Sequence, residues 1–262
     1  METEPERYAL RVATATAAAS GSQPAGVYLH GSAVLGGFDA RRSDVDILVV
    51  CDSPMTSAQQ RAVAEALSEQ RLPCPGRGLE LSIVTLQVAQ HPVAEPAFEL
   101  HLTTAPEDTK VIDGHQRGGD PDLVLHFAVC RRAGRLIGPG LPAAEAFGPV
   151  PGDLVAAQLA TELRWGAEHA PDEYAVLNAC RAWRFAVDGA LVSKIDGGQW
   201  ALGRTRVPER ELIKIALDKQ RSLPAAELDR CAVKQFVRQA LTHLTRRRHN
   251  TNPAASGFRP GW

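Results

Sequence analysis

The sequence is poor in aromatic residues, methionine and cysteine, and it lacks a long apolar run. Aromatic residues make up 5% of the 262 positions, and there are two methionines and five cysteines. The cysteines are far apart and form no CxxC pair, which disfavours disulfides or a zinc site and fits a reducing compartment. No apolar run approaches the roughly 20 residues of a membrane span, and the acidic N-terminus has no apolar signal-peptide core. We therefore expect a cytoplasmic protein without a membrane contact.

An excess of charge of either sign is also missing. The formal net charge is −1, with 29 basic and 30 acidic side chains, which argues against a broad electrostatic grip on nucleic acid. Hydrophobic residues account for 44% of the chain, which is enough for a sizeable core. The length of 262 residues supports one large domain or two modest ones. We expect a monomer that binds small molecules and no nucleic acid.

The first half of the chain alternates between helical and strand patterns. Apolar runs rich in β-branched residues predict strands, and alanine-rich segments with 3.6-residue periodicity predict helices. Segments rich in proline, glycine or polar residues predict loops. The expected strands are residues 27–30, 45–50, 79–86 and 98–103; the helices are 7–20, 56–70 and 123–132; the loops are 71–78 and 106–120.

After Pro151 the pattern becomes entirely helical. Four segments with helical periodicity follow, at residues 153–169, 172–189, 208–222 and 225–247. The sequence therefore predicts an α+β protein: a mixed sheet with flanking helices over residues 1–150, then an all-α bundle over residues 151–249. The proline-, glycine- and serine-rich residues 250–262 are expected to be a disordered tail.

One stretch concentrates residues suited to phosphate and metal chemistry. Gly31 permits a close approach of the backbone to a ligand, and Ser32 follows where a helix would begin, so that backbone amides and its hydroxyl can bind phosphate oxygens. Asp44 and Asp46 are two apart at the start of a strand and project from one face. Two close carboxylates repel each other unless a cation lies between them, and Mg²⁺ favours hard oxygen ligands shared with phosphates.

A third carboxylate, Glu80, lies on the next predicted strand between two leucines. It is costly to bury without a partner, and if its strand pairs with that of Asp46 it joins the same cluster as a metal ligand or general base. Turn or capping roles are the alternative for the two aspartates. Ser43 either binds phosphate or only begins the strand.

These residues carry a resemblance to a known family. The segments LHGSAVLGGFDARRSDVDILVV and LELSIV, the linker LIGPGLPAAEAFGPVP and the helical EYAVLNACRAWRFAVDGALVSKIDGGQWAL resemble the aminoglycoside adenylyltransferases that modify streptomycin and spectinomycin. That family is part of the nucleotidyltransferase superfamily related to DNA polymerase β. The resemblance covers most of residues 25–245.

The resemblance implies an ATP-dependent transferase of class EC 2.7.7 that confers antibiotic resistance by moving AMP to a drug hydroxyl. Asp44, Asp46 and Glu80 would bind two Mg²⁺ ions with ATP, and Glu80 would act as the base. Arg181 and Lys194 match residues that contact the ATP phosphates, and opposite charge makes such contacts favourable. A solvated surface charge is the alternative for Arg181.

The drug contacts that the resemblance implies lie in the helical part. Asp172 and Glu173 match acidic residues that bind the cationic aminocyclitol, with Glu168 and Trp165 as further candidates. Asp172 also suits a helix N-cap after Pro171. Family members that accept both drugs carry a tryptophan in the loop after the strand near residues 98–103, where this chain has Thr103 and Thr104, so spectinomycin is favoured. The alternatives are another small molecule, a protein or a tRNA as acceptor, or a non-catalytic antitoxin or regulator.

Overall fold

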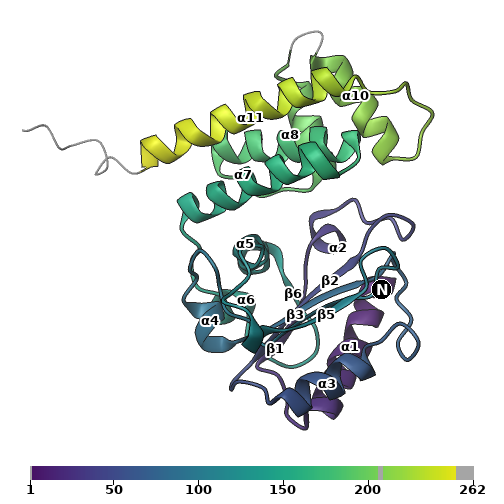
Figure 1. The fold of residues 1–262 in the computed structure, drawn as a ribbon, viewed down its shortest axis with the longest axis vertical. Helices are drawn as coiled ribbons and strands as arrows, with labels where there is room; N and C mark the ends of the chain where they lie inside the picture. Colours follow the sequence, from purple (N-terminus) through teal and green to yellow (C-terminus); the bar gives the residue numbers. More distant parts are fainter. Residues whose placement is uncertain (1, 206–208, 252–262) are drawn as a thin grey trace, which may run out of the picture. The chain divides into compact units, whose positions relative to one another are not determined.

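Two compact units, Met1–Val150 and Pro151–Trp262, make up the chain in a computed structural model. The structure describes residues 2–205 and 209–251. The predicted fold class is confirmed, because unit 1 holds a mixed sheet with flanking helices and the described part of unit 2 is helical (Figure 1). Of the expected tail, residues 250 and 251 end the last helix, and residues 252–262 lie outside the described range.

A six-stranded sheet forms the centre of unit 1, in the order β5-β4-β3-β2-β1-β6. The strands β2 and β3 are parallel, and every other neighbouring pair is antiparallel. The strands are β1 (Gly26–Leu29), β2 (Val45–Cys51), β3 (Leu79–Thr85), β4 (Leu100–Thr103), β5 (Lys110–Asp113) and β6 (Arg135–Leu136).

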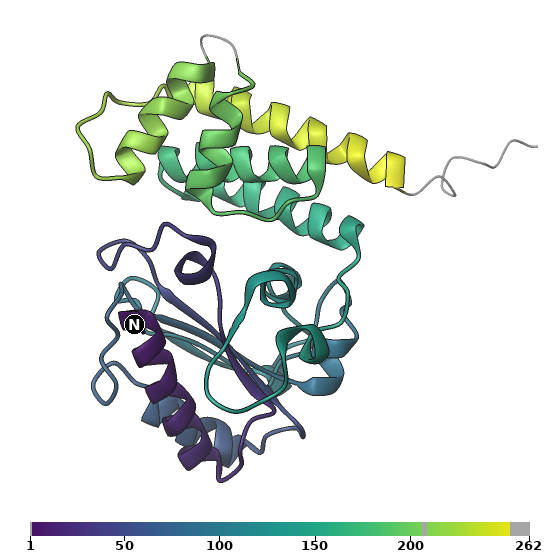
Figure 2. The same cartoon turned by 180° about the vertical axis from the view of Figure 1, so that it is seen from behind.

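Helices cover both faces of this sheet, and alternation along the strands decides which side chain meets which helix. On one face Ile47 and Val49 pack with α1 (Glu4–Ser20) and α3 (Ser57–Ala66). On the other face Leu48 and Val50 pack with α5 (Leu123–Ala133) (Figures 1 and 2). The short helices α4 (Leu86–Gln90) and α6 (Ala143–Ala146) also contribute to the α5 face. Asp46 and Glu80 therefore share the α5 face by alternation.

The structure corrects one loop of unit 1. Residues 106–120, expected to be a loop, contain β5 and a short 3-10 helix, Gly114–Gln116. The strand has four residues, none of them buried, and lies at the edge of the sheet. Its side chains therefore lack the alternation by which a half-buried strand is recognised.

Unit 2 contains five helices among its described residues, one more than expected. They are α7 (Gly152–His169), α8 (Asp172–Asp188), α9 (Lys194–Leu202), α10 (Glu209–Gln220) and α11 (Arg230–Thr251). The additional helix α9 is short and contains Gly197 and Gly198, which weaken a helical pattern. These glycines pack closely, since a Cβ on Gly197 would lie 2.9 Å from the backbone nitrogen of Arg181 in α8. The predicted helix at 225–247 begins five residues later.

Candidate active site

The carboxylates of Asp46 and Glu80 lie side by side at one end of the sheet. β2 and β3 run in parallel and pair Asp46 with Glu80, so both side chains project towards the α5 face. Both residues are partly exposed, whereas their neighbours Val45, Leu79 and Leu81 are buried on the opposite face. The sheet therefore holds two acidic side chains in fixed positions, with a buried apolar layer on its opposite face.

Gly31 is required beside Asp46. Its backbone has φ 59° and ψ −141°, a region that only glycine adopts readily. A Cβ at this position would lie 1.8 Å from Oδ2 of Asp46. Ser32 follows as the first residue of the single-turn helix α2 (Ser32–Leu35). The sequence HGS thus turns the chain tightly against the Asp46 carboxylate, which occupies the space that a side chain at position 31 would need.

Asp44 forms a bidentate ion pair with Arg77. The Nε and one terminal nitrogen of Arg77 donate to the two oxygens of Asp44, each at 3.2 Å. The Arg77 Nε also lies 2.9 Å from Oε1 of Glu107. Burial raises the pKa of the Asp44 carboxyl, Arg77 lowers it, and the charges of Glu80 and Glu107 raise it further. The effect of the Glu80 charge on the pKa of Asp44 shows that Asp44 lies within electrostatic range of Glu80.

Ser43 forms hydrogen bonds that hold the loop before β2 in place. Its hydroxyl accepts a hydrogen bond from the backbone N–H of Asp39 at 3.1 Å. Its carbonyl accepts the backbone N–H of Arg77 at 2.9 Å. Ser43 therefore shapes the approach to Asp44, and its phosphate-binding role stays a prediction.

Three histidines lie in the part of unit 1 that holds Glu80, and none of them was predicted from the sequence as a site residue. His30 is 3% exposed, its ring centroid is 4.9 Å from that of His126, and burial lowers its pKa well below the ordinary value. The Nε2 of His126 is 3.9 Å from Oε1 of Glu80. His101 pairs with Ser82 across the sheet, 3.0 Å from Nδ1 to Oγ. Alternation along β3 and β4 would have placed His101 on the face of Glu80, but only once their register was known.

The donor chemistry of this end of the sheet suits a hard divalent cation. Asp44, Asp46 and Glu80 offer carboxylate oxygens, the ligands that such a cation prefers, and the Gly31 turn lets the Asp46 carboxylate lie directly against the backbone. Within residues 2–205 and 209–251, however, no three His, Cys, Asp or Glu side chains are arranged as a group that could hold a metal. The two oxygens of Asp44 instead face the Arg77 guanidinium.

In unit 2 the two residues predicted to contact phosphate, Lys194 and Arg181, lie close to other side chains. The Nζ of Lys194, at the start of α9, lies 3.9 Å from the ring centroid of Tyr174. The ring of Trp165 packs edge-on against the same tyrosine, with 6.5 Å between centroids. Arg181 lies 4.0 Å from Glu162. Tyr174 thus connects a predicted phosphate contact with a predicted drug contact, although no sequence pattern singles it out.

The predicted acidic drug contacts lie at the junction of α7 and α8. Asp172 accepts a hydrogen bond from Arg230 of α11 at 2.7 Å. The same arginine reaches the carbonyl of Glu168 at 3.3 Å. Glu173 is half-buried beside Asp172 in the first turn of α8. The expected N-cap hydrogen bond of Asp172 is not formed, because Asp172 is the first helical residue and Pro171 is the cap.

Comparison with known proteins decides the family. The model of the C-terminal domain of aminoglycoside adenylyltransferases matches residues 145–243, and the nucleotidyltransferase domain model matches residues 14–75. The chain belongs to the aminoglycoside adenylyltransferase family of nucleotidyltransferases. It is accordingly a transferase of class EC 2.7.7.

A solved structure shares the fold of this chain. It is a spectinomycin adenyltransferase, AAD(9) from Enterococcus faecialis, crystallised with ATP and spectinomycin. The likeness has a TM-score of 0.61 at 17% identity and covers 84% of this chain and 91% of the other. The comparison with curated proteins finds no match.

In the part of the chain that the structure describes, no helix is long and apolar enough to cross a membrane.

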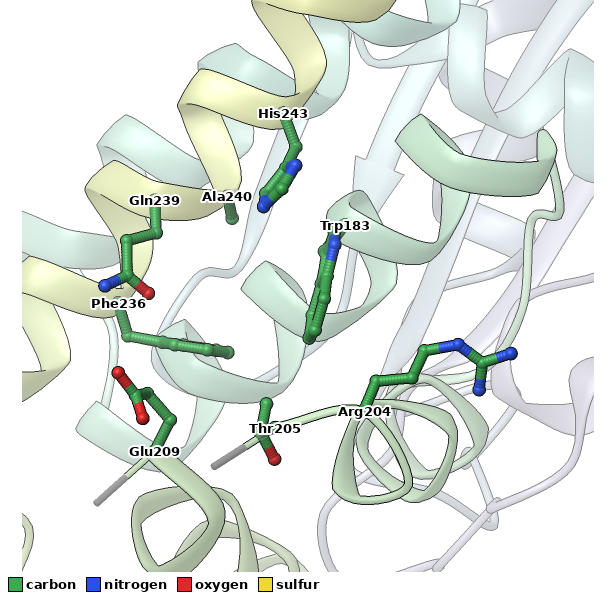
Figure 3. Close-up of a pocket in the computed structure, with 8 residues that line it drawn as sticks. All are labelled: Trp183, Arg204, Thr205, Glu209, Phe236, Gln239, Ala240 and His243. Carbon is green, nitrogen blue, oxygen red and sulfur yellow. The ribbon is translucent and has the colours of Figure 1, made fainter. Parts of the chain in front are cut away.

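A cavity of about 280 Å³ in the helical unit of this adenylyltransferase contains none of the predicted site residues (Figure 3). Trp183 forms one wall, with His243 stacked on it at 5.5 Å and Phe236 nearby. Arg204 and Glu209 line the same cavity, and the Arg204 guanidinium lies 4.3 Å above the ring of Trp200. Its lining is of mixed character, because Arg204, Thr205, Glu209 and Gln239 lie among the aromatic rings.

Proposed function

We propose that this adenylyltransferase transfers AMP from Mg·ATP to a hydroxyl group of an aminocyclitol antibiotic, with spectinomycin as the first candidate. The observation that carries the proposal is the pairing of Asp46 with Glu80 across β2 and β3, with Asp44 two residues before Asp46. This arrangement would hold a base and two metal ligands at one rigid end of the sheet, as in-line nucleotidyl transfer requires. The presence of ATP and spectinomycin in the solved structure of similar fold is consistent with it.

The chain's own residues would divide the chemistry as follows. The Gly31–Ser32 turn and Lys194 would bind the triphosphate, with Arg181 and Ser43 as further phosphate contacts. Glu80 would take the proton from the acceptor hydroxyl. The oxygen would then attack the α-phosphorus in line, and pyrophosphate would leave. Asp44, Asp46 and Glu80 would hold two Mg²⁺ ions, whose positive charge stabilises the attacking and leaving oxygens.

The acceptor assignment rests on charge and on one missing side chain. Asp172, Glu173 and Glu168 concentrate negative charge near the exposed ring of Trp165, which suits a cationic ligand with apolar faces. The chain has no tryptophan before Trp165, so the segment after β4 lacks the residue that accompanies dual specificity in the family. We therefore favour spectinomycin over streptomycin, and drug resistance as the biological outcome.

An adenylylation assay tests the proposal directly. Pyrophosphate release is measured with ATP, Mg²⁺ and either drug, for the wild type and for Glu80→Gln. We expect turnover with spectinomycin and a loss of 100-fold or more in Glu80→Gln, because a positioned general base contributes about 10²–10⁴-fold. Turnover with neither drug would reject the aminocyclitol acceptor. Turnover with spectinomycin that is unchanged in Glu80→Gln would reject the catalytic assignment.

A further inference from the structure

The segment that carries Arg77 is built into the edge of the candidate site. Arg77 lies between Gly76 and Gly78, and neither glycine has room for a side chain. A Cβ on Gly76 would lie 2.6 Å from the carbonyl oxygen of Ser43, and one on Gly78 would lie 2.4 Å from the backbone nitrogen of Ala105. The chain therefore passes closely between the residues that precede β2 and the segment that follows β4.

Backbone hydrogen bonds hold this segment in register with Asp44. The N–H of Arg77 donates to the carbonyl of Ser43 at 2.9 Å, and the N–H of Val45 donates to the carbonyl of Gly78 at 2.8 Å. These two bonds flank Asp44 and extend the pairing of β2 with β3 by one step. The Arg77 Cα is thus placed beside Asp44 by the sheet.

The side chain of Arg77 completes a three-member network. Its planar fork donates to both oxygens of Asp44 at 3.2 Å, and its Nε lies 2.9 Å from Glu107 on the turn between β4 and β5. A bidentate fork fixes the plane of a carboxylate as well as its position. Each carboxylate oxygen has two lone pairs, so Asp44 can accept these bonds and still ligate a cation.

We propose that Arg77 is a positioning residue that fixes the Asp44 carboxylate for metal binding, with Glu107 holding the same guanidinium at its Nε. This inference rests on the proposed function, because it assumes that Asp44 binds a divalent cation with the nucleotide. Residues that orient a metal ligand from outside the coordination shell change metal affinity by about 10–100-fold when they are replaced. Arg77 is not expected to touch the reacting atoms.

The test separates the shape of the arginine from its charge. Arg77→Lys keeps the charge and loses the bidentate fork, Arg77→Gln loses both, and Glu107→Ala removes the outer support. Arg71→Lys is the matched control, because Arg71 makes an exposed ion pair with Glu65 away from the site. Binding of Mn²⁺ is measured by water proton relaxation enhancement in the presence of α,β-methylene-ATP, and thermal unfolding midpoints are recorded for every variant.

We expect both Arg77 variants to weaken Mn²⁺ binding by about tenfold or more, Glu107→Ala to weaken it less, and Arg71→Lys to leave it unchanged, with similar unfolding midpoints throughout. In turnover, kcat should fall while the KM of the acceptor stays constant. Full rescue by Arg77→Lys would overturn the orienting role, since charge alone would then suffice. Tighter Mn²⁺ binding in Arg77→Gln would overturn it as well, by showing that the guanidinium competes with the cation. A wild type without any Mn²⁺ signal would reject the proposed function itself.

Discussion

The predicted site residues of unit 1 and of unit 2 are held by different means. In unit 1, strand pairing fixes Asp46 opposite Glu80, and backbone bonds bring Arg77 to Asp44. In unit 2, side-chain contacts hold the corresponding residues, such as Lys194 over the ring of Tyr174 and Asp172 against Arg230. Most of these contacts are partly exposed to solvent.

We infer from this difference that the two units meet different requirements for how exactly their site residues are positioned. A catalytic base and metal ligands must be held to within a fraction of an ångström, which backbone pairing in a sheet achieves. Contacts with a flexible triphosphate or a drug tolerate more movement, and long side chains on helices allow it. The sheet end should therefore respond sharply to small changes of shape, and the helical unit should respond weakly.

Among changes that test this comparison of the two units, the largest effect should come from Gly31→Ala. The added Cβ would collide with the Asp46 carboxylate, which is 1.8 Å away, in a backbone conformation with φ 59°. Displacing that carboxylate by about an ångström should lower kcat by about 100-fold. Turnover of spectinomycin and unfolding by denaturant are the measurements.

Gly36→Ala provides the matched control for this change. Gly36 also has a positive φ, 87°, yet no atom lies within 4 Å of its would-be Cβ. Both variants should lose about 1–3 kcal/mol of stability through backbone strain, but only Gly31→Ala should lose activity beyond that. Equal activity in the two variants would mean that sheet-based positioning of Asp46 is not what catalysis depends on.

The same contrast explains how far the sequence could predict the structure. Asp44, Asp46 and Glu80 could be selected because strand alternation and the GS and DxD spacing act locally along the chain. Arg77 could not, because it lies in a segment whose glycines and prolines indicate only a loop. Its role arises from contacts with Ser43 and Glu107, which are distant in sequence.

The helical unit was less predictable in its details. Periodicity indicated α7, α8 and α10, but the glycines of α9 concealed that helix, and α11 begins at Arg230 where 225 was expected. Tyr174 and Glu162 also went unselected, because an aromatic or acidic residue on a helix is ordinary until its neighbours from other helices are known. Contacts between helices depend on packing, which a single sequence does not reveal.

A lower pH should have an intermediate effect on the free energy of unfolding, and this effect should arise from His30 in unit 1. Burial keeps the pKa of His30 well below 6.5 in the folded state, so below pH 6.5 the unfolded chain binds a proton that the folded chain does not. The free energy of unfolding should then fall as the pH drops from 6.5, by up to about 1.4 kcal/mol per pH unit. Replacing His30 by Phe should flatten this slope in urea titrations between pH 7 and 5, whereas changing the exposed His91 to Asn should preserve it. An unchanged slope in His30→Phe would contradict the assignment.

The smallest effect is expected in unit 2, at the ion pair between Asp172 and Arg230. The pair is partly exposed, with 25% and 49% of the side chains accessible, so breaking it should cost at most about 1 kcal/mol of stability. If Asp172 attracts the cationic acceptor, Arg230→Gln removes a competing cation and should lower the KM for spectinomycin a fewfold, since one charge in water contributes about 1 kcal/mol at 4 Å. Asp172→Asn should raise the same KM and leave the KM for ATP unchanged. A KM for spectinomycin that moves in the same direction in both variants would assign the pair to helix packing alone, and unit 2 would then owe its drug contacts to other residues.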